Sequence, residues 1–257
     1  MQNAQLVGLS RQVALQRELD VVANNIANLN TNGFKADGVV FQEMLMPGVS
    51  ANQFPAPDRR ISYVHDRATW LDMSAGSFQT TGGPLDVAIN GQGFLAVQTA
   101  RGERYTRNGA LSLNAAGEMV TSDGDRVLGD NGPIVLLPQD QNIAISEDGS
   151  ISVREGSNAT LDSRRGKLRI VTFAQPELLQ KEGSSLFAAP AGVAPQAAPP
   201  IVRLVQGAIE KSNVRSVVEM TRMIEVTRTY TEISAMLANQ SDQRRAAIQQ
   251  LSDIPTS

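Results

Sequence analysis

The aspartates of the stretch SDGDRVLGDNG are the residues whose spacing comes closest to a metal site. Asp123, Asp125 and Asp130 lie near one another in the chain, and carboxylate oxygens are the ligands that calcium takes. The stretch lacks the regularly spaced oxygen ligands and the closing glutamate of a calcium-binding loop. Its aspartates and glycines are typical of turns between strands. We therefore predict solvated turns and no metal.

Two glycines of INGQGF, Gly91 and Gly93, follow an apolar run as in a dinucleotide-binding loop. The third glycine and the following helix that such a loop needs are missing, so we predict a tight turn between strands. The chain has no cysteine and a single histidine, His65, which excludes thiolate and multi-histidine metal sites and Ser-His-Asp triads. A carboxylate pair for sugar hydrolysis stays open, because its pairing is spatial. The expectation is a protein that is not an enzyme and needs no cofactor.

The charge distribution argues against two classes of partner. The 257 residues carry 23 Lys and Arg against 26 Asp and Glu, a formal net charge of −3. No segment forms the basic stripe that nucleic acid or an anionic membrane requires. No run approaches the ~18 consecutive apolar residues of a membrane span, and the first residues lack the pattern of a cleavable secretory signal. We expect neither nucleic-acid binding nor membrane insertion.

A second group of polar residues, the asparagines of VVANNIANLNTNGFK, belongs to a helix predicted over residues 4–30. Its seam follows the 4-3-4-3 spacing of a coiled coil and consists of Leu15, Leu19, Val22, Ile26 and Leu29. Asn24, Asn25 and Asn28 fall off this seam. Amides donate and accept hydrogen bonds and cost less to bury than charges, so we predict that these three form an inter-subunit surface. Asn30, Thr31, Asn32 and Gly33 then end the helix.

A second long helix is predicted from Ser216 to about residue 250. Its seam has a 3-4-3-4 spacing and consists of Met223, Val226, Tyr230, Ile233 and Leu237. Ser216 and Glu219 form a capping box, and Asn213 is a second possible cap. We expect the two helices to pair antiparallel as a coiled coil, although packing of both against the middle of the chain stays an alternative. A two-helix hairpin cannot bury all its apolar surface, so copies or partners must cover the rest.

Between the helices the apolar period changes to two, which is typical of strands. FLAVQT and RYTRNG are predicted to form a hairpin, and further short apolar runs alternate with glycine-containing turns. We predict a segregated α and β fold in which an antiparallel all-β domain is inserted between the helices. The predicted segments are a helix and turn at 1–46, an irregular connector at 47–80, the β domain at 81–208 with a Pro/Ala connector at 188–200, and the C-terminal helix at 209–257.

The stretch ANNIANLNTNGFK, residues 23–35, resembles the N-terminal signature of flagellar axial proteins, the rod and hook subunits. The resemblance extends through PLDVAINGQGFLAVQT, YTRNGALSLNAAGEMVT, GAIEKSNV and EMTRMIEVTRTY. Chain length and the segment 47–80 are most similar to the proximal rod subunits, and next to the distal ones. The resemblance adds Phe34 and Lys35 to the helix-terminating motif. Thr231 departs from the glutamate common in the family.

The resemblance implies a structural role. Such a subunit is exported by the flagellar type III apparatus without a cleaved signal peptide, and it polymerises with its own copies and other rod subunits into a hollow rod in the periplasm. The terminal helices would form the inner layer and the β domain the outer one. The alternative from a different class is a secreted β domain that binds or cleaves polysaccharide and uses its helices to oligomerise. Scarce aromatic residues, at 4%, weigh against that alternative.

Overall fold

The computed structural model describes residues 2–47, 60–155, 162–183 and 185–252. The chain divides into two compact units. The helical unit contains Met1–Ile26, Asp37–Trp70 and Arg215–Ser257, and the β unit contains Ala27–Ala36 and Leu71–Val214. Two helices and a largely antiparallel β domain between them agree with the predicted fold class.

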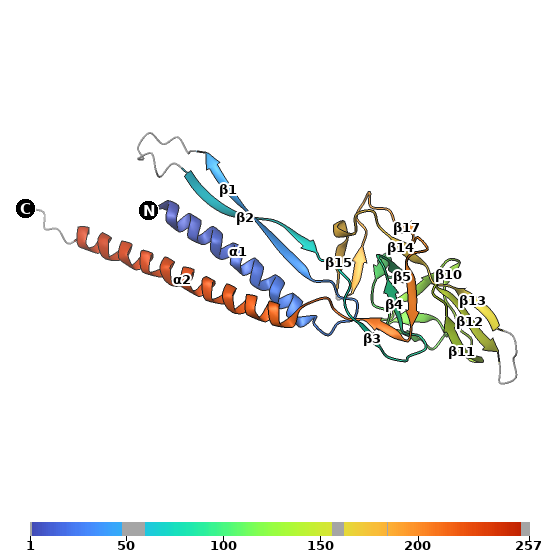
Figure 1. Ribbon diagram of the computed structural model, residues 1–257. Coiled ribbons are helices and arrows are strands. Elements are labelled where there is room, and N and C mark those ends of the chain that lie inside the picture. Colours follow the sequence, from blue (N-terminus) through green and yellow to red (C-terminus); the bar gives the residue numbers. More distant parts are fainter. Residues whose placement is uncertain (1, 48–59, 156–161, 184, 253–257) are drawn as a thin grey trace, which may run out of the picture. The chain divides into compact units, whose positions relative to one another are not determined.

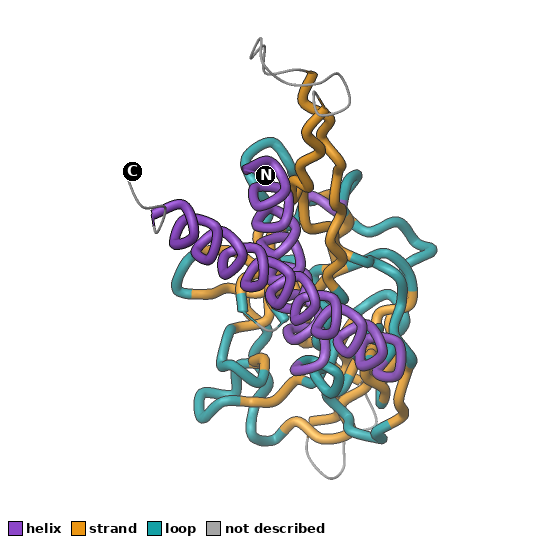
Figure 2. The backbone as a smooth tube through the Cα atoms, turned by 90° about the vertical axis from the view of Figure 1, so that its left-hand side faces the viewer, coloured by secondary structure: helices purple, strands orange, loops and turns teal. Residues whose placement is uncertain are grey.

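The helical unit is built on α1 (Gln2–Ala27) and α2 (Ser216–Ser252), which lie side by side in both views (Figures 1 and 2). Gln12 Nε2 donates a hydrogen bond to Ser234 Oγ at 3.1 Å, and Arg222 Nε donates to Glu18 Oε1 at 2.8 Å. Residues later in α1 thus meet residues earlier in α2, so the helices run antiparallel. Near the start of α1, Leu237 packs against Gly8, where a Cβ atom would collide with its side chain.

The first helix ends earlier than predicted. Asn28 and Leu29, expected at helical heptad positions, lie in the turn that follows Ala27. The Asn28 carbonyl accepts a hydrogen bond from the Thr31 amide at 3.2 Å, and its side-chain oxygen accepts one from Thr31 Oγ1 at 3.1 Å. Asparagine side chains compete with helix hydrogen bonds in this way, which favours turns.

Two long strands were not predicted. One lies almost wholly in the segment 1–46, and the other lies in the irregular connector predicted at 47–80, of which residues 48–59 are outside the described part of the chain. Strands β1 (Asp37–Pro47) and β2 (Arg60–Leu71) pair with each other, and β3 (Phe78–Thr80) follows. The apolar and β-branched residues of both long segments suit strands. Pro47 is the last residue of β1, so it does not stand in the interior of that strand. Gly38 lies against the Trp70 ring, where a Cβ atom would collide with the indole.

The β unit holds the remaining strands, arranged in several sheets. The largest has ten strands, with the main order β15-β16-β6-β5-β9-β8-β7, and β10, β14 and β17 attached to it. A three-stranded sheet has the order β11-β12-β13, and the pairs β18-β4 and β19-β3 complete the unit. The bounds are β4 (Val87–Asn90), β5 (Phe94–Thr99), β6 (Gly102–Thr106), β7 (Leu111–Leu113), β8 (Met119–Thr121), β9 (Arg126–Gly129), β10 (Gly132–Pro133), β11 (Asp140–Ile145), β12 (Ser150–Glu155), β13 (Asp162–Lys167), β14 (Ile170–Thr172), the short 3-10 helix η2 (Pro176–Leu178), β15 (Gln180–Glu182), β16 (Leu186–Ala188), β17 (Gln196–Ala197), β18 (Arg203–Gln206) and β19 (Ala208–Glu210).

Strand β5 separates two apolar cores. Leu95 and Val97 face one core, and Phe94 and Ala96 face the other, as the period of two requires. In the second core the Phe94 ring meets Phe173 and Phe187 edge to face. The predicted hairpin is present, since β5 and β6 pair antiparallel and close between Thr99 and Gly102.

The Pro/Ala segment 188–200 is predicted to be an extended connector and not the interior of a strand. Three of its residues differ: Ala188 ends β16 and pairs with β15, and Gln196 and Ala197 form β17, which pairs antiparallel with β14. None of the three is proline, so their backbone amides remain available for the ladder.

Candidate functional site

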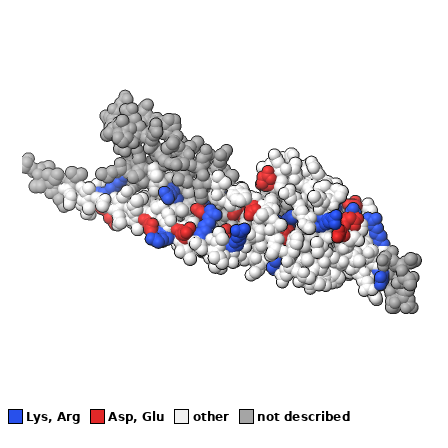
Figure 3. Space-filling model, in the orientation of Figure 1, with Lys and Arg blue, Asp and Glu red and all other residues white. Residues whose placement is uncertain are grey.

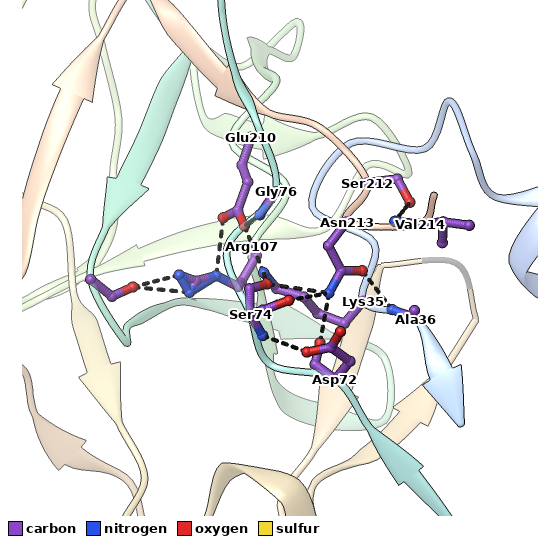
Figure 4. Close-up of polar contacts among 11 residues, drawn as sticks. Lys35, Ala36, Asp72, Ser74, Gly76, Arg107, Glu210, Ser212, Asn213 and Val214 are labelled. Atoms are coloured by element: carbon purple, nitrogen blue, oxygen red, sulfur yellow. Dashed lines mark hydrogen bonds and ion pairs between the residues drawn. The ribbon is translucent and has the colours of Figure 1, made fainter. Parts of the chain in front are cut away.

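Three charged side chains that the sequence places far apart meet inside the β unit (Figure 4). Lys35 Nζ lies 2.6 Å from Glu210 Oε1, and Arg107 Nε lies 3.1 Å from Glu210 Oε2. All three residues are almost fully buried. We call Lys35, Arg107 and Glu210 the ion-pair cluster.

Three separate backbone segments bring these side chains together. Lys35 follows the turn after α1, Arg107 follows β6, and Glu210 ends β19. Gly33 makes the approach possible: its φ is +70°, and any Cβ atom there would collide with the backbone of Arg107 and Asn108. Its amide donates to the Glu210 carbonyl at 2.8 Å. Glycine tolerates this conformation and this close contact without a steric cost.

Neutral backbone groups complete the hydrogen bonding of the cluster. The Gly76 amide donates to Glu210 Oε1 at 2.9 Å, and Lys35 Nζ donates to the Ser74 carbonyl at 2.6 Å. Both terminal nitrogens of Arg107 donate to the Gly91 carbonyl, at 3.0 and 2.5 Å. The charges are therefore both paired and hydrogen-bonded, which buried charges require.

The cluster contains two cations and one anion. Burial lowers the pKa of Lys35, the nearby Arg107 charge lowers it further, and Glu210 opposes both effects. Burial also lowers the pKa of Arg107, again opposed by Glu210. Glu210 is thus the group that makes both buried cations tolerable. Its enclosure, with 0% of the side chain exposed, suits a structural ion pair better than a group that reacts with substrate.

Asn213 closes the same region beside the ion-pair cluster (Figure 4). Its side-chain oxygen accepts a hydrogen bond from the Ala36 amide at 2.7 Å, and its Nδ2 donates to the Asp72 carbonyl at 2.8 Å. Its own amide donates to the Phe34 carbonyl at 3.4 Å. The sequence makes Asn213 a possible cap of the second helix, but its side chain joins two other segments of the chain.

The rest of the predicted helix-terminating motif surrounds these contacts. Asn32 Oδ1 accepts from Lys211 Nζ at 3.1 Å, and the buried Phe34 ring lies 3.9 Å from Lys181 Nζ. Thr31 is half-buried and Asn30 is exposed. The motif therefore does more than end a helix, because Gly33, Phe34 and Lys35 are part of the β unit's interior. Sequence reasoning missed Arg107 and Glu210 altogether.

The predicted seam residues differ in burial within the helical unit. Val22 and Val226 are buried, and Met223 is 41% exposed. The others on the two helices are half-buried: Leu15, Leu19, Ile26, Tyr230, Ile233 and Leu237. Leu29 belongs to the turn after α1 and is outside the helix.

The three asparagines assigned to one inter-subunit surface have different surroundings. Asn25 is 1% exposed, and its amide exchanges two hydrogen bonds of 2.9 Å with the backbone of Asp37. Its Nδ2 also lies 3.4 Å from Glu219 Oε2. The prediction is wrong for Asn25, because its amide is used within its own chain. Asn28 helps to form the turn after α1, and Asn24 is exposed on the helix.

The residues considered for metal or nucleotide binding lie in turns. Asp123 and Asp125 belong to the turn between β8 and β9, where burial and the neighbouring Asp123 charge raise the pKa of Asp125. Gly91 and Gly93 lie in the bend between β4 and β5. Among the described residues, no group of three or more His, Cys, Asp or Glu side chains is arranged to hold a metal ion.

The sequence leaves open a pair of carboxylates for sugar hydrolysis, and one surface cavity of about 460 Å³ in the β unit is lined by several carboxylates. Its lining includes Asp130, Glu147 and Asp148. Glu147 pairs with Arg203 at 2.8 Å, and Asp148 pairs with Lys167 at 3.5 Å. Hydrogen bonds from Ser150 lower the pKa of Asp148, whereas the general acid of a glycosidase needs a raised pKa. The cavity gives no positive support to sugar hydrolysis.

The surface charges agree with the even distribution in the sequence. Figure 3 shows blue and red side chains interspersed, without a large patch of either sign on the face drawn. Within the described residues, neither helix has a stretch long and apolar enough to cross a membrane.

Three family models match the chain at both ends and in the middle. They are a flagella basal body rod protein model at residues 6–35, a flagellar hook protein FlgE/F/G D1 domain model at 88–153, and a flagellar basal body rod FlgEFG protein C-terminal model at 205–251. The first contains Lys35, the second Arg107 and the third Glu210, so all three members of the ion-pair cluster lie in matched segments.

Curated relatives extend the match to the whole chain. The flagellar basal-body rod protein FlgF of Caulobacter vibrioides is 36% identical over 99% of this chain and 100% of its own length. FlgF of Mesorhizobium japonicum is 33% identical over 98% of both chains, and FlgG of Bacillus subtilis is 34% identical over 91% of this chain and 94% of its own. The predicted resemblance is confirmed: the chain belongs to the family of flagellar basal-body rod proteins, as a structural subunit similar to FlgF and next to FlgG.

Proposed function

We propose that the chain is a subunit of the proximal part of the rod and polymerises through its terminal helices into a hollow shaft in the periplasm. Its partners are its own copies and other rod subunits, and the flagellar type III apparatus exports it without cleavage of a signal peptide. The observation that carries the proposal is the apolar surface that both helices leave exposed.

Exposed apolar side chains form a stripe on each helix. Val217, Met220 and Ile224 are 75%, 50% and 70% exposed, and their spacing places them on one side of α2. Leu9 and Val13, one turn apart on α1, are 54% and 64% exposed. Helix α2 also extends past the N-terminal end of α1 (Figure 1). Contiguous apolar surface of this kind marks a protein interaction site.

The predicted heptad seams fit this proposal as contacts both within and between chains. Val22 and Val226 are covered inside the helical unit, while Met223 is 41% exposed and can contact a neighbouring helix. We propose that the intrachain pair and the neighbouring helices form a coiled-coil layer around the channel. Such a layer would bury the exposed stripes and stiffen the shaft through many modest contacts.

Asn24 and Asn28 remain for the inter-subunit surface after the correction for Asn25. Asn24 lies on the exposed side of α1, on the same face as Val13 by helical spacing, and Asn28 is half-buried in the turn after α1. A neutral amide can exchange hydrogen bonds with a neighbouring subunit at a lower desolvation cost than a charged side chain. Lysine in its place would bury a charge, so Asn24→Lys should weaken assembly without altering the fold of the monomer.

A distal rod position is the second candidate. The similarity to FlgG of Bacillus subtilis, at 34% identity over most of both chains, is comparable to the similarity to the FlgF relatives. Both candidates use the same helices and differ in the axial neighbours of the subunit.

The proposal is tested with two matched substitutions of exposed apolar residues. Ile224→Asp introduces a charge into the stripe on α2, whereas Val205→Asp does so on β18, where the side chain is 41% exposed. Each variant replaces the wild-type gene, and rods are counted in electron micrographs of purified basal bodies. We expect Ile224→Asp to abolish rods and Val205→Asp to retain them. Normal rods with Ile224→Asp would contradict assembly through this stripe.

A further inference from the structure

The covalent chain passes between the two units at four places. The chain segments at three of these places are in contact around Glu210 and Asn213. Ala36 precedes the passage into β1, Leu71 and Asp72 follow the return from β2, and Asn213 precedes the passage into α2. The Asp72 amide donates to the Ala36 carbonyl at 2.9 Å, and Asn213 binds both the Ala36 amide and the Asp72 carbonyl. These three chain segments are thus hydrogen-bonded to one another within the β unit.

The ion-pair cluster fastens the same segments more firmly. Lys35 comes from the first segment, its second acceptor Ser74 from the next, and Glu210 from the last. Both side chains of the Lys35–Glu210 pair are almost fully excluded from water. Charge-assisted hydrogen bonds are short and about twice as strong as neutral ones, so these contacts hold the segments in one arrangement.

This arrangement bears on how the two helices find each other. Helix α1 ends at Ala27 and α2 begins at Ser216, so their pairing closes a very long loop of sequence. With Ala36 held to Asn213, the free path from helix to helix is only about 12 residues. Two further contacts close paths of similar length. The Lys35–Glu210 pair leaves about 14 residues between the helices, and the Gly33 amide bound to the Glu210 carbonyl leaves about 12, so one helix stays at a high effective concentration near the other.

We propose that the ion-pair cluster and Asn213 together preorganise the helix pair by holding the two helix-bearing segments of the chain side by side. With these contacts in place, α1 and α2 pair across a short stretch of free chain, although they are far apart in the sequence. The ion-pair cluster and Asn213 lie outside the helices and outside the exposed stripes, so the inference does not depend on the proposed rod function. Its consequence is that substitutions in the β unit weaken pairing between α1 and α2 without touching either helix.

The test exploits the absence of native cysteine. Gln12→Cys and Ser234→Cys are introduced together in the full chain, at positions whose side chains lie 3.1 Å apart across the helices. The equilibrium between the two thiols and their disulfide, measured against a glutathione buffer, gives their effective concentration. Asn213→Ala and Lys35→Met are added singly and together. The matched controls are Asn114→Ala, in an exposed turn, and Arg203→Met, in the exposed ion pair with Glu147.

We expect the double variant to lower the effective concentration more than either single variant does, because each single change leaves the other side-chain contact in place. Both controls should keep the parent value. Amide hydrogen exchange in β5 shows whether the β unit stays folded. If the double variant unfolds it, the two single variants decide, each against its own matched control. With a folded β unit, junction variants whose effective concentrations equal those of their controls would overturn the proposal.

Discussion

Lys35 and Glu210 form a 2.6 Å ion pair although 175 positions separate them in the sequence, and their side chains are 1% and 0% exposed. The pair joins a segment that follows the first helix to a strand that precedes the second. Arg107 shares the same carboxylate from a third segment. One buried carboxylate, that of Glu210, is therefore paired with two buried cations. Loss of the anion and loss of one cation should differ in their effect on stability, and this difference can be measured.

Removal of the anion should cost more than removal of one cation. Glu210→Gln leaves Lys35 and Arg107 buried without a counter-charge, and we expect a loss of about 3–5 kcal/mol in the free energy of unfolding. Lys35→Met leaves the Arg107–Glu210 pair intact and should cost about 1.5–3 kcal/mol, as for one hydrogen bond to a charged group. Urea unfolding of both variants makes the comparison. Equal losses would show that the shared carboxylate is not the central group.

Gly33 should tolerate alanine less well than a glycine of similar conformation in open space. Gly33 and Gly82 have φ values of +70° and +72°, but only Gly33 has backbone atoms where a Cβ atom would lie. We expect Gly82→Ala to cost about 1 kcal/mol for the conformation alone. Gly33→Ala should cost a further ~1–3 kcal/mol for the collision. The difference between the melting temperatures of the two variants measures the cost of the collision at Gly33. Identical melting temperatures would contradict a collision there.

Tyr105 should make the protein sensitive to alkali. Burial, followed by the hydrogen bond to Glu103, raises the pKa of Tyr105 to about 12 from its usual 10.0; that bond is 3.0 Å long. The unfolded chain loses this proton at a lower pH than the folded chain does. The stabilising contribution is therefore complete below pH 10 and declines as the pH rises towards 12. Urea titrations over this range should show the decline in the wild type, and a weaker one in Tyr105→Phe. The same slope in both would exclude Tyr105 as the cause.

Two neighbouring positions on α2 should separate folding from assembly. Val226 is 6% exposed and Ile224 is 70% exposed. Val226→Asp buries an unpaired carboxyl group and should lower the free energy of unfolding of the monomer by at least about 2 kcal/mol. Ile224→Asp should change it by less than about 0.5 kcal/mol. Circular dichroism during thermal unfolding provides the measurement. A large loss with Ile224→Asp would mean that this residue is covered within its own chain.

The sequence predicted the elements whose signals are local. Both long helices, the β5–β6 hairpin and the glycine turns follow from apolar spacing and turn composition, which act over a few residues. The strand β2 was missed because prolines at 47, 55 and 57 suggested irregular chain, and β1 was missed because residues up to 46 were assigned to the first helix and its turn. In the described part, Pro47 ends a strand and does not interrupt one.

Most of the candidate site could not be predicted from the sequence, because the residues that pair in it are far apart along the chain. Lys35 was assigned to a motif that ends a helix, yet nothing near it in the sequence indicates Glu210 or Arg107. Asn25 shows the same limit: helical spacing placed it off the seam, but spacing cannot reveal that the Asp37 backbone would occupy its amide. Long-range pairing decides the role of such residues, and local patterns do not encode it.

The central claim is that this chain builds the rod through its terminal helices. Cryo-electron microscopy of basal bodies purified from the organism tests it most directly, since the density can be matched to this chain along the axis. We predict that the chain occupies the proximal rod, with α1 and α2 lining the channel and the Val217 and Ile224 stripe buried against a neighbouring subunit. A rod density without this chain, or subunits that contact one another only through the β unit, would contradict the account.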